Sequence, residues 1–306
     1  MKLLINRPVS YTCLVILMSV FSLPAKAQIS VDADPRDPRQ KAVIDEVNYR
    51  FTYRTMFSED TVGRKKYYDN QILEIGTKYV RYYSRFAEVM DSTWYKHSVT
   101  GERKSPGGSY RRTEDLQPDE TGQYEDLFFN YPEQGILTVV NTIRKKIYSY
   151  SETVPSFDWR ITGKTASILG YECNEAVTDF RGRRWHVWFT YDIPLRYGPW
   201  KLGGLPGLIL KAEDAEGLYT YELIGIQKPH SEAMYKYETQ QVIKCKRKDI
   251  LRINDMRWKD PYGHATSNGA GIMRFYMKDP KTGKTRGMTP QEYAAVIGYI
   301  PQRELE

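Results

Sequence analysis

Residue types that bind metals or act as nucleophiles are scarce in this chain of 306 residues. It has three cysteines and four histidines. The histidines are His97, His186, His230 and His264. None lies three to five residues from another, the spacing from which zinc sites usually draw ligands, so no metal site is predicted. A Gly-x-Ser-x-Gly elbow, a phosphate-binding loop and a dinucleotide fingerprint are also missing, so no cofactor is expected.

The N-terminal apolar run is too short to span a bilayer. It extends from Tyr11 to Leu23, about 13 residues against the roughly 20 that a spanning helix needs. Lys2 and Arg7 precede it, and Ala25-Lys26-Ala27 provides a small-x-small cleavage site after it. This pattern predicts a secretory signal peptide over residues 1–27. We therefore expect an exported protein, periplasmic, extracellular or associated with the outer membrane, with no transmembrane segment after cleavage.

Little positive charge is left once the signal peptide is removed. The full chain carries 45 Lys and Arg against 38 Asp and Glu, and three of the basic residues lie in residues 1–27, so the mature charge is 42 − 38 = +4. Such a small excess predicts no nucleic-acid partner. Cleavage also removes Cys13 and leaves Cys173 and Cys245. In an oxidising compartment these two form either one disulfide or two buried free thiols, and their spacing does not decide.

Alternating apolar and polar residues dominate the middle of the chain. After a polar, flexible segment over residues 28–44, the side chains from Val47 to Tyr53 alternate with the period of a half-buried strand. Hairpins are predicted at four turns: Gly76-Thr77, Arg144-Lys145, Arg181-Gly182 and residues 214–217. Hairpins in succession, without intervening helices, indicate an antiparallel meander.

Helical patterns are short and few. Apolar spacing predicts helices over residues 85–97 and 248–258, and the capping box Thr289-Pro290-Gln291-Glu292 predicts one over residues 290–297. The predicted fold is therefore α+β, a single domain over residues 45–306 built on one strongly curved, mostly antiparallel sheet. Such a sheet is similar to the half-barrel of periplasmic lipoprotein carriers, at the level of fold alone.

One segment, GGLPGLIL at residues 203–210, is apolar and yet rich in glycine and proline. Its glycines Gly203, Gly204 and Gly207 are free to adopt positive φ, and Leu-Pro-Gly favours a type II turn with Pro206 at its second position. In one interpretation this turn leads into a buried strand, with Leu205, Leu208 and Leu210 in the core and Tyr197 and Trp200 beside them. In the other, the glycines let a ligand approach the backbone, with Trp200 as one wall of its site.

The same segment carries a family resemblance. The hexapeptide that names the family is Gly204, Leu205, Pro206, Gly207, Leu208 and Ile209. Around it, residues 170–176 (GYECNEA), 180–183 (FRGR), 188–190 (WFT) and 198–200 (GPW), together with Trp159 and Ile193-Pro194, match as well. Over residues 136–226 the chain resembles the GLPGLI family, exported proteins of the Bacteroidetes first noted in Porphyromonas. The resemblance implies export but no known biochemical activity, and no catalytic residue is transferred from it.

Three other groups of residues are candidates for chemistry. Cys173 and His186 lie on strands predicted to be neighbours, but counting from the turn places Thr190, not His186, opposite Cys173. Acidic residues that could pair for acid and base catalysis are Glu172, Glu175, Asp179 and Glu222, although chance pairs are common among so many carboxylates. Arg181, Arg183, Arg184 and Trp188 could bind an anion or a flat ligand, or could be a solvated face beside a buried Trp185.

The sequence thus favours a non-catalytic binding or carrier module of the cell envelope. Its ligand is expected to be apolar or lipid-like and to lie near the concave face of the sheet and the loop from Tyr197 to Gly207. Alternatives are an extracytoplasmic hydrolase with a scattered site, or a partner subunit of an outer-membrane complex with an exposed aromatic patch near Trp188 or Tyr82. Catalysis therefore stays undecided, and no catalytic residue is assigned.

Overall fold

The computed structural model describes residues 41–58, 66–100, 122–143, 146–238, 242–259, 276–279, 282–289, 291–292 and 303–305, without the side chains of residues 93–100 and 257–259. The predicted signal peptide and residues 28–40 lie outside this description. The chain divides into a larger unit over residues 29–103, 111–255 and 300–306 and a smaller one over residues 1–28, 104–110 and 256–299.

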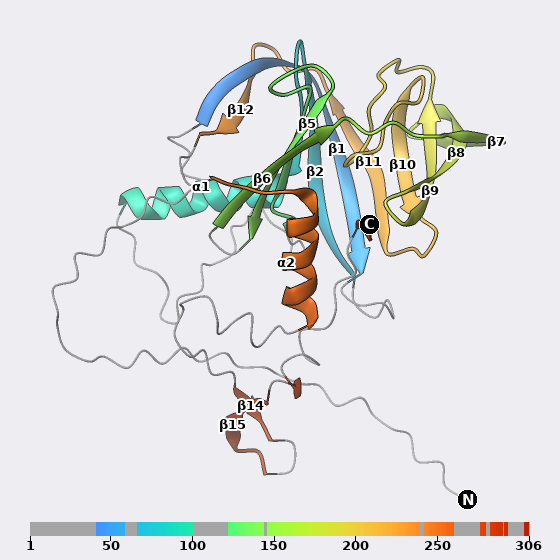
Figure 1. The fold of residues 1–306 in the computed structure, drawn as a ribbon. Helices are drawn as coiled ribbons and strands as arrows, with labels where there is room; N and C mark the ends of the chain where they lie inside the picture. The colour runs from blue at the N-terminus through green and yellow to red at the C-terminus, as the bar shows by residue number, and fades with distance from the viewer. Residues whose placement is uncertain are drawn as a thin grey trace, which may run out of the picture. The chain divides into compact units, whose positions relative to one another are not determined.

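One open sheet, mostly antiparallel, forms the larger unit (Figure 1). Its first six strands are β1 (Lys41–Ser58), β2 (Lys66–Gly76), β3 (Val80–Ser84), β4 (Glu125–Phe129), β5 (Ile136–Ile143) and β6 (Lys146–Thr153). The next five are β7 (Arg160–Ile168), β8 (Tyr171–Phe180), β9 (Arg183–Thr190), β10 (Leu208–Asp214) and β11 (Tyr219–Gln227). Two short strands follow, β12 (Ala233–Tyr237) and β13 (Val242–Lys244).

Two meanders meet at the centre of this sheet. The strand order is β13-β6-β5-β4-β3-β2-β1-β11-β10-β9-β8-β7. The first meander runs from β1 outward to β6; the chain then crosses through residues 154–159 to β7 at the opposite edge and returns to β11, which pairs with β1. β12 pairs with the start of β1, and β13 pairs parallel to β6. The predicted β-rich, largely antiparallel fold is confirmed, and each predicted hairpin is present.

β1 begins at Lys41, before the point where order was predicted to start. Residues 41–44, assigned from sequence to the flexible segment, are therefore part of a strand. They pair with β12, and the Lys41 amino group lies 2.9 Å from a carboxylate oxygen of Glu88. No local pattern indicates this pairing, because the partner strand is almost two hundred residues away along the chain.

Both of the predicted longer helices are confirmed. They are α1 (Arg85–Thr100), which contacts β2 and β3, and α2 (Arg247–Lys259). In the smaller unit the described residues include a two-stranded hairpin of β14 (Tyr276–Lys278) and β15 (Thr285–Gly287). No helix among the described residues is long and apolar enough to cross a membrane.

The predicted capping box is present at Thr289. The Glu292 amide donates to the Thr289 hydroxyl at 3.2 Å, and the Thr289 amide donates to the Glu292 carboxylate at 2.9 Å. Gln291 and Glu292 are helical, and the rest of the helix predicted over residues 290–297 lies outside the described residues.

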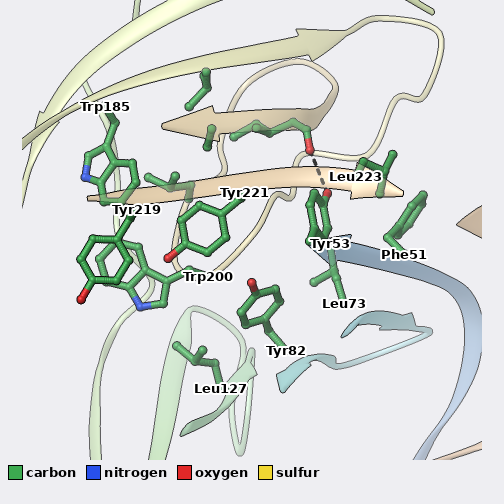
Figure 2. Close-up of a cluster of buried hydrophobic side chains, with 14 of the residues drawn as sticks. Phe51, Tyr53, Leu73, Tyr82, Leu127, Trp185, Trp200, Tyr219, Tyr221 and Leu223 are labelled. Carbon is green, nitrogen blue, oxygen red and sulfur yellow. Dashed lines mark hydrogen bonds between the residues drawn. The ribbon is translucent and has the colours of Figure 1, made fainter. Parts of the chain in front are cut away.

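Alternation along the strands separates two faces of the sheet. We call the face that carries Tyr53, Leu73, Tyr82, Leu127 and Tyr221 the inner face, and the opposite one the outer face (Figure 2). All five of these side chains are buried. Tyr82 therefore cannot belong to the exposed aromatic patch that was considered for it.

β9 follows the alternation predicted from its sequence. Trp185, Val187 and Phe189 are buried in the core, and Arg184, His186 and Trp188 lie on the outer face. The partly exposed side chains of β9 therefore lie on the outer face.

Candidate functional site

The GLPGLI segment is part of the core. Leu205 is 3% exposed, and Leu208, Ile209 and Leu210 are fully buried as the first strand residues of β10. The Tyr53 hydroxyl donates to the Ile209 carbonyl at 2.8 Å, which fastens the segment to the centre of the sheet (Figure 2). Its apolar residues are thus used internally, as the first of the two interpretations expected.

The glycines serve different purposes from those predicted. Of Gly203, Gly204 and Gly207, only Gly204 has a positive φ, of 86°. The predicted type II turn needs a positive φ at Gly207 and is therefore wrong. Gly207 is required for a close approach instead, because a Cβ there would lie 1.8 Å from the Thr190 carbonyl oxygen at the end of β9. The missing side chain lets the start of β10 lie against β9.

Backbone groups of this loop already have protein partners. The Trp159 indole donates to the Gly203 carbonyl at 2.9 Å, and the Arg196 guanidinium donates to the Gly204 carbonyl at 2.8 Å. The Gly204 amide in turn donates to the Arg196 carbonyl at 2.9 Å. A ligand approaching this backbone would have to displace these bonds.

Trp200 does not form the wall of an open site. It is 1% exposed and packs between the rings of Phe180 and Trp185, with ring centroids 5.7 and 5.6 Å away. Tyr197 is half-buried, and its hydroxyl accepts a hydrogen bond from Asn130 at 3.4 Å. Both side chains stabilise the inner face.

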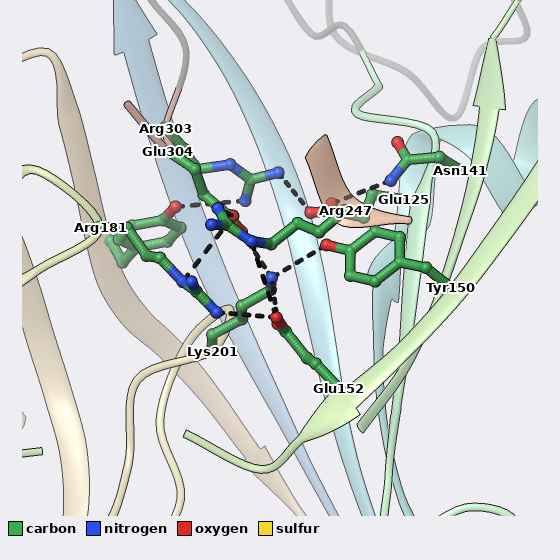
Figure 3. Close-up of polar contacts among 10 residues, drawn as sticks. Glu125, Asn141, Tyr150, Glu152, Arg181, Lys201, Arg247, Arg303 and Glu304 are labelled. Carbon is green, nitrogen blue, oxygen red and sulfur yellow. Dashed lines mark hydrogen bonds and ion pairs between the residues drawn. The ribbon is translucent and has the colours of Figure 1, made fainter. Parts of the chain in front are cut away.

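Lys201, the residue after Trp200, has a fully buried amino group (Figure 3). It lies 2.7 Å from Glu152 of β6 and 2.5 Å from Glu304, and it donates to the Tyr150 hydroxyl at 3.0 Å. Two guanidinium groups share the same carboxylates: Arg181 lies 2.7 Å from Glu152, and Arg247 lies 2.7 Å from Glu304. We call these five charged residues the Lys201 cluster.

The electrostatics of the cluster follow from burial. Burial by itself raises the pKa of the Glu304 carboxyl, but Lys201 and Arg247 more than offset it, so the pKa lies below its ordinary value. Burial and the nearby carboxylates raise the pKa of Tyr150. The cluster therefore holds Glu304 ionised at neutral pH, paired with cations rather than available as a general acid.

The arginine-rich run does not form a patch. Arg183 is buried and lies 2.8 Å from Asp214 and 2.9 Å from Glu216. Arg184 lies on the outer face, 2.9 Å from Asp179. Because Arg181 belongs to the Lys201 cluster, the three guanidinium groups of this run face three different surroundings.

Cys173 and Cys245 are both free thiols, so the disulfide considered for them is not formed. Cys173 is buried, which raises the pKa of its thiol. Cys245 directly follows the last residue of β13. The register of β8 and β9 pairs Asn174 with Phe189 and places His186 opposite Val177, as counting predicted. Cys173 and His186 are therefore not a catalytic pair.

Trp188 lies in a row of side chains across the outer face. Its direct neighbours are Glu175 on β8 and Lys211 on β10, and Lys211 faces Glu222 on β11. The Lys211 amino group is 5.2 Å from the centroid of the Trp188 ring, and it is also 3.2 Å from Glu213. The ring is partly buried, so it is held in a fixed position with charged, hydrogen-bonding groups around it. We call this row the Trp188 face.

Glu175 anchors one end of the Trp188 face. Its carboxylate lies 3.2 Å from the Nδ1 atom of His186 and 3.2 Å from Lys164, and it accepts a hydrogen bond from Thr162. Burial raises the pKa of Glu175, while these three partners lower it, with a net effect below the ordinary value. An ionised Glu175 fixes the orientation of the His186 ring.

A small cavity lies elsewhere, between β12 and the outer face of β4 to β6. Its volume is about 20 Å³, and Phe128, Ile147 and Tyr237 are among the residues that line it. That is room for about one water molecule and too little for an organic ligand. Among the described residues, no group of three or more His, Cys, Asp or Glu is arranged to hold a metal ion.

Sequence reasoning missed the Lys201 cluster and the neighbours of Trp188 on β10 and β11. The one local signal was a lysine inside an otherwise apolar stretch. Its partners come from β6, α2 and residues near the C-terminus, which no local pattern connects.

Comparison with known proteins adds one family and two structures. Residues 121–255 match the family described as N-glycanase peptide, N-terminal domain. Two structures of PNGF-II are similar, one in a P21 and one in a C2 crystal form, with 17% and 18% sequence identity and TM-scores of 0.44 and 0.45. The alignments cover 71% and 70% of this chain but 34% and 33% of the PNGF-II chains, so the chain spans about a third of their length. No curated protein sequence matches.

Proposed function

We propose that this chain is an exported, non-catalytic binding module of the cell envelope and that the Trp188 face holds its ligand. The observation that carries the proposal is the fixed, partly exposed Trp188 ring flanked by Glu175 and Lys211. Binding sites commonly combine an aromatic surface with a few placed polar groups. The inner face offers less free surface for a ligand, because Trp200 and the Lys201 cluster fill it. This argues against the apolar ligand expected there.

The ligand we infer is a carbohydrate. A sugar ring presents C–H groups on one side, which pack on an indole, and hydroxyls at its rim, which bond to carboxylates, amines and imidazole. Lys211, Glu222 and His186 supply such groups around Trp188, and the buried Glu175 orients His186. The match of residues 121–255 with the N-terminal domain of an N-glycanase, a protein named for N-glycans, supports this ligand class.

Strong curvature of the sheet is part of the proposal. From β6 to β7 the strand order takes ten steps, which in a flat sheet would separate them by roughly 48 Å. The six linking residues, 154–159, reach roughly 24 Å when extended. A link this short supports a sheet that bends its two edges toward each other, like a half-barrel.

Titration calorimetry with an N-glycosylated peptide and its unglycosylated form tests the proposal. Residues 28–306 should bind the glycosylated form only, and Trp188→Ala should weaken binding at least tenfold. Tyr235→Ala is the matched control, since Tyr235 is an aromatic residue on β12 that is 38% exposed. Equal binding by Trp188→Ala and the wild type, with thermal unfolding showing both folded, would sink the proposal.

A hydrolase is the second candidate, favoured by the hydrogen bond between Glu175 and His186. A carboxylate that orients an imidazole is a common arrangement for a general base. If the chain is a hydrolase, incubation with the glycosylated peptide releases a product that mass spectrometry detects, and His186→Ala abolishes that release. Intact peptide after incubation with the wild type would exclude hydrolysis of this peptide and favour the binding module.

A further inference from the structure

Residues 303–305, which belong to the larger unit, are held against its strands and loops mainly by their side chains (Figure 3). Arg303 and Glu304 are almost buried, whereas Leu305 is 54% exposed. Among the described residues, one backbone hydrogen bond fixes this segment, from the Leu305 amide to the Arg181 carbonyl at 3.0 Å. The segment is not a strand of the sheet, so its contacts are of the kind that a bound peptide makes.

The Arg303 side chain enters an acidic and aromatic site. Its guanidinium lies 2.7 Å from Glu125 of β4 and donates to the Tyr221 hydroxyl at 3.3 Å. It also lies 5.3 Å from the centroid of the Trp200 ring and 6.0 Å from that of Tyr219. A guanidinium fits these surroundings better than an ammonium, since it stacks on rings while it donates in its own plane.

The next residue, Glu304, enters a cationic site. Its two carboxylate oxygens lie 2.5 Å from Lys201 and 2.7 Å from Arg247. If the segment left, Lys201 would keep Glu152 but lose its second carboxylate, and Glu125 would lose its guanidinium. The receptor groups belong to β4, β11, α2 and the loop after β9, so they are positioned independently of the segment.

We infer that these two adjoining sites form a peptide receptor on the inner face, selective for an arginine followed by an acidic residue in an extended chain. Residues 303–305 are its resident occupant, and an Arg-Glu segment of another polypeptide can take their place. The receptor does not depend on the Trp188 face and its ligand. It gives the module a second contact, with a protein.

Fluorescence anisotropy tests the receptor with a labelled peptide of residues 301–306 (PQRELE). The protein is residues 28–306 carrying Arg303→Ala and Glu304→Ala, which empties both sites. We expect this variant to bind the peptide and the wild type to bind at least tenfold more weakly, because the tethered segment competes at an effective concentration of about millimolar. The reversed peptide (ELERQP) has the same composition and should bind at least tenfold more weakly than PQRELE.

Adding Glu125→Gln to the emptied variant should weaken its binding of PQRELE. A peptide with glutamine in place of its arginine should bind this triple variant no more weakly than PQRELE does. If the double variant is unfolded by near-ultraviolet circular dichroism, Glu304→Gln alone replaces it, because glutamine has the shape of glutamate. The inference is overturned if a folded variant does not bind PQRELE, or if it binds the reversed peptide equally well.

Discussion

Replacing Gly207 by alanine tests whether the GLPGLI segment is built for close packing. An added Cβ would lie 1.8 Å from the Thr190 carbonyl oxygen and 2.7 Å from its carbonyl carbon. Real Cβ atoms essentially never come within 3.0 Å, so β9 and the start of β10 must separate by at least 3.0 − 1.8 = 1.2 Å. Both partners are backbone atoms, which cannot rotate away, so we expect a loss of at least about 3 kcal/mol, the upper end for overpacked cores.

Urea unfolding, followed by tryptophan fluorescence, measures this loss from the midpoint at an unchanged slope. Gly217→Ala is the control, because Gly217 has a φ of 66° and open space around its Cβ position. It should cost only about 1 kcal/mol, the strain of a left-handed residue with a side chain. If Gly207→Ala is no more destabilising than Gly217→Ala, the close-packing explanation of the motif is refuted.

Three more predictions concern the buried polar groups. Lys201→Met should lower the free energy of unfolding by about 3 kcal/mol in urea titrations, because Glu152 and Glu304 lose a buried partner; a loss below about 1 kcal/mol would contradict the geometry. The pKa of Glu304 is lower in the folded chain than its ordinary value of 4.5, so its contribution is complete above about pH 4.5 and disappears as the pH falls through the folded value. The stability difference between wild type and Glu304→Gln should therefore shrink in acid. A difference that grows below pH 4.5 would contradict the lowered pKa of Glu304. Tyr53→Phe should cost about 1 kcal/mol by thermal unfolding, since its hydroxyl donates to the Ile209 carbonyl, and an unchanged midpoint would count against that bond.

β1 and β9 were readable from the sequence because buried residues alternate with less buried ones along each of them. The alternation in β1 and β9 gave their inner and outer residues, and turn residues gave the hairpins. Strand order was not readable, since β1 pairs with β11 across more than 160 residues of chain. The beginning of β1 was missed for the same reason, because β12 provides its partner.

Site prediction failed where a side chain's role depends on distant partners. One of the two interpretations placed Trp200 as the wall of a ligand site, but aromatic rings from β8 and β9 bury it. The run from Arg181 to Arg184 resembled a basic patch, yet a turn and the period of a strand direct its guanidinium groups to different places. Trp188 was correctly placed on the outer face, since alternation with the buried Trp185 and Val187 is a local property.

Hydrogen exchange measured by mass spectrometry, with and without the N-glycosylated peptide, tests the central claim most directly. If the Trp188 face holds the ligand, binding slows exchange in β9 and β10, residues 183–190 and 208–214, and leaves residues 197–207 unchanged. If protection appears instead over residues 197–207, the ligand lies at this loop, on the inner face, and the account is contradicted.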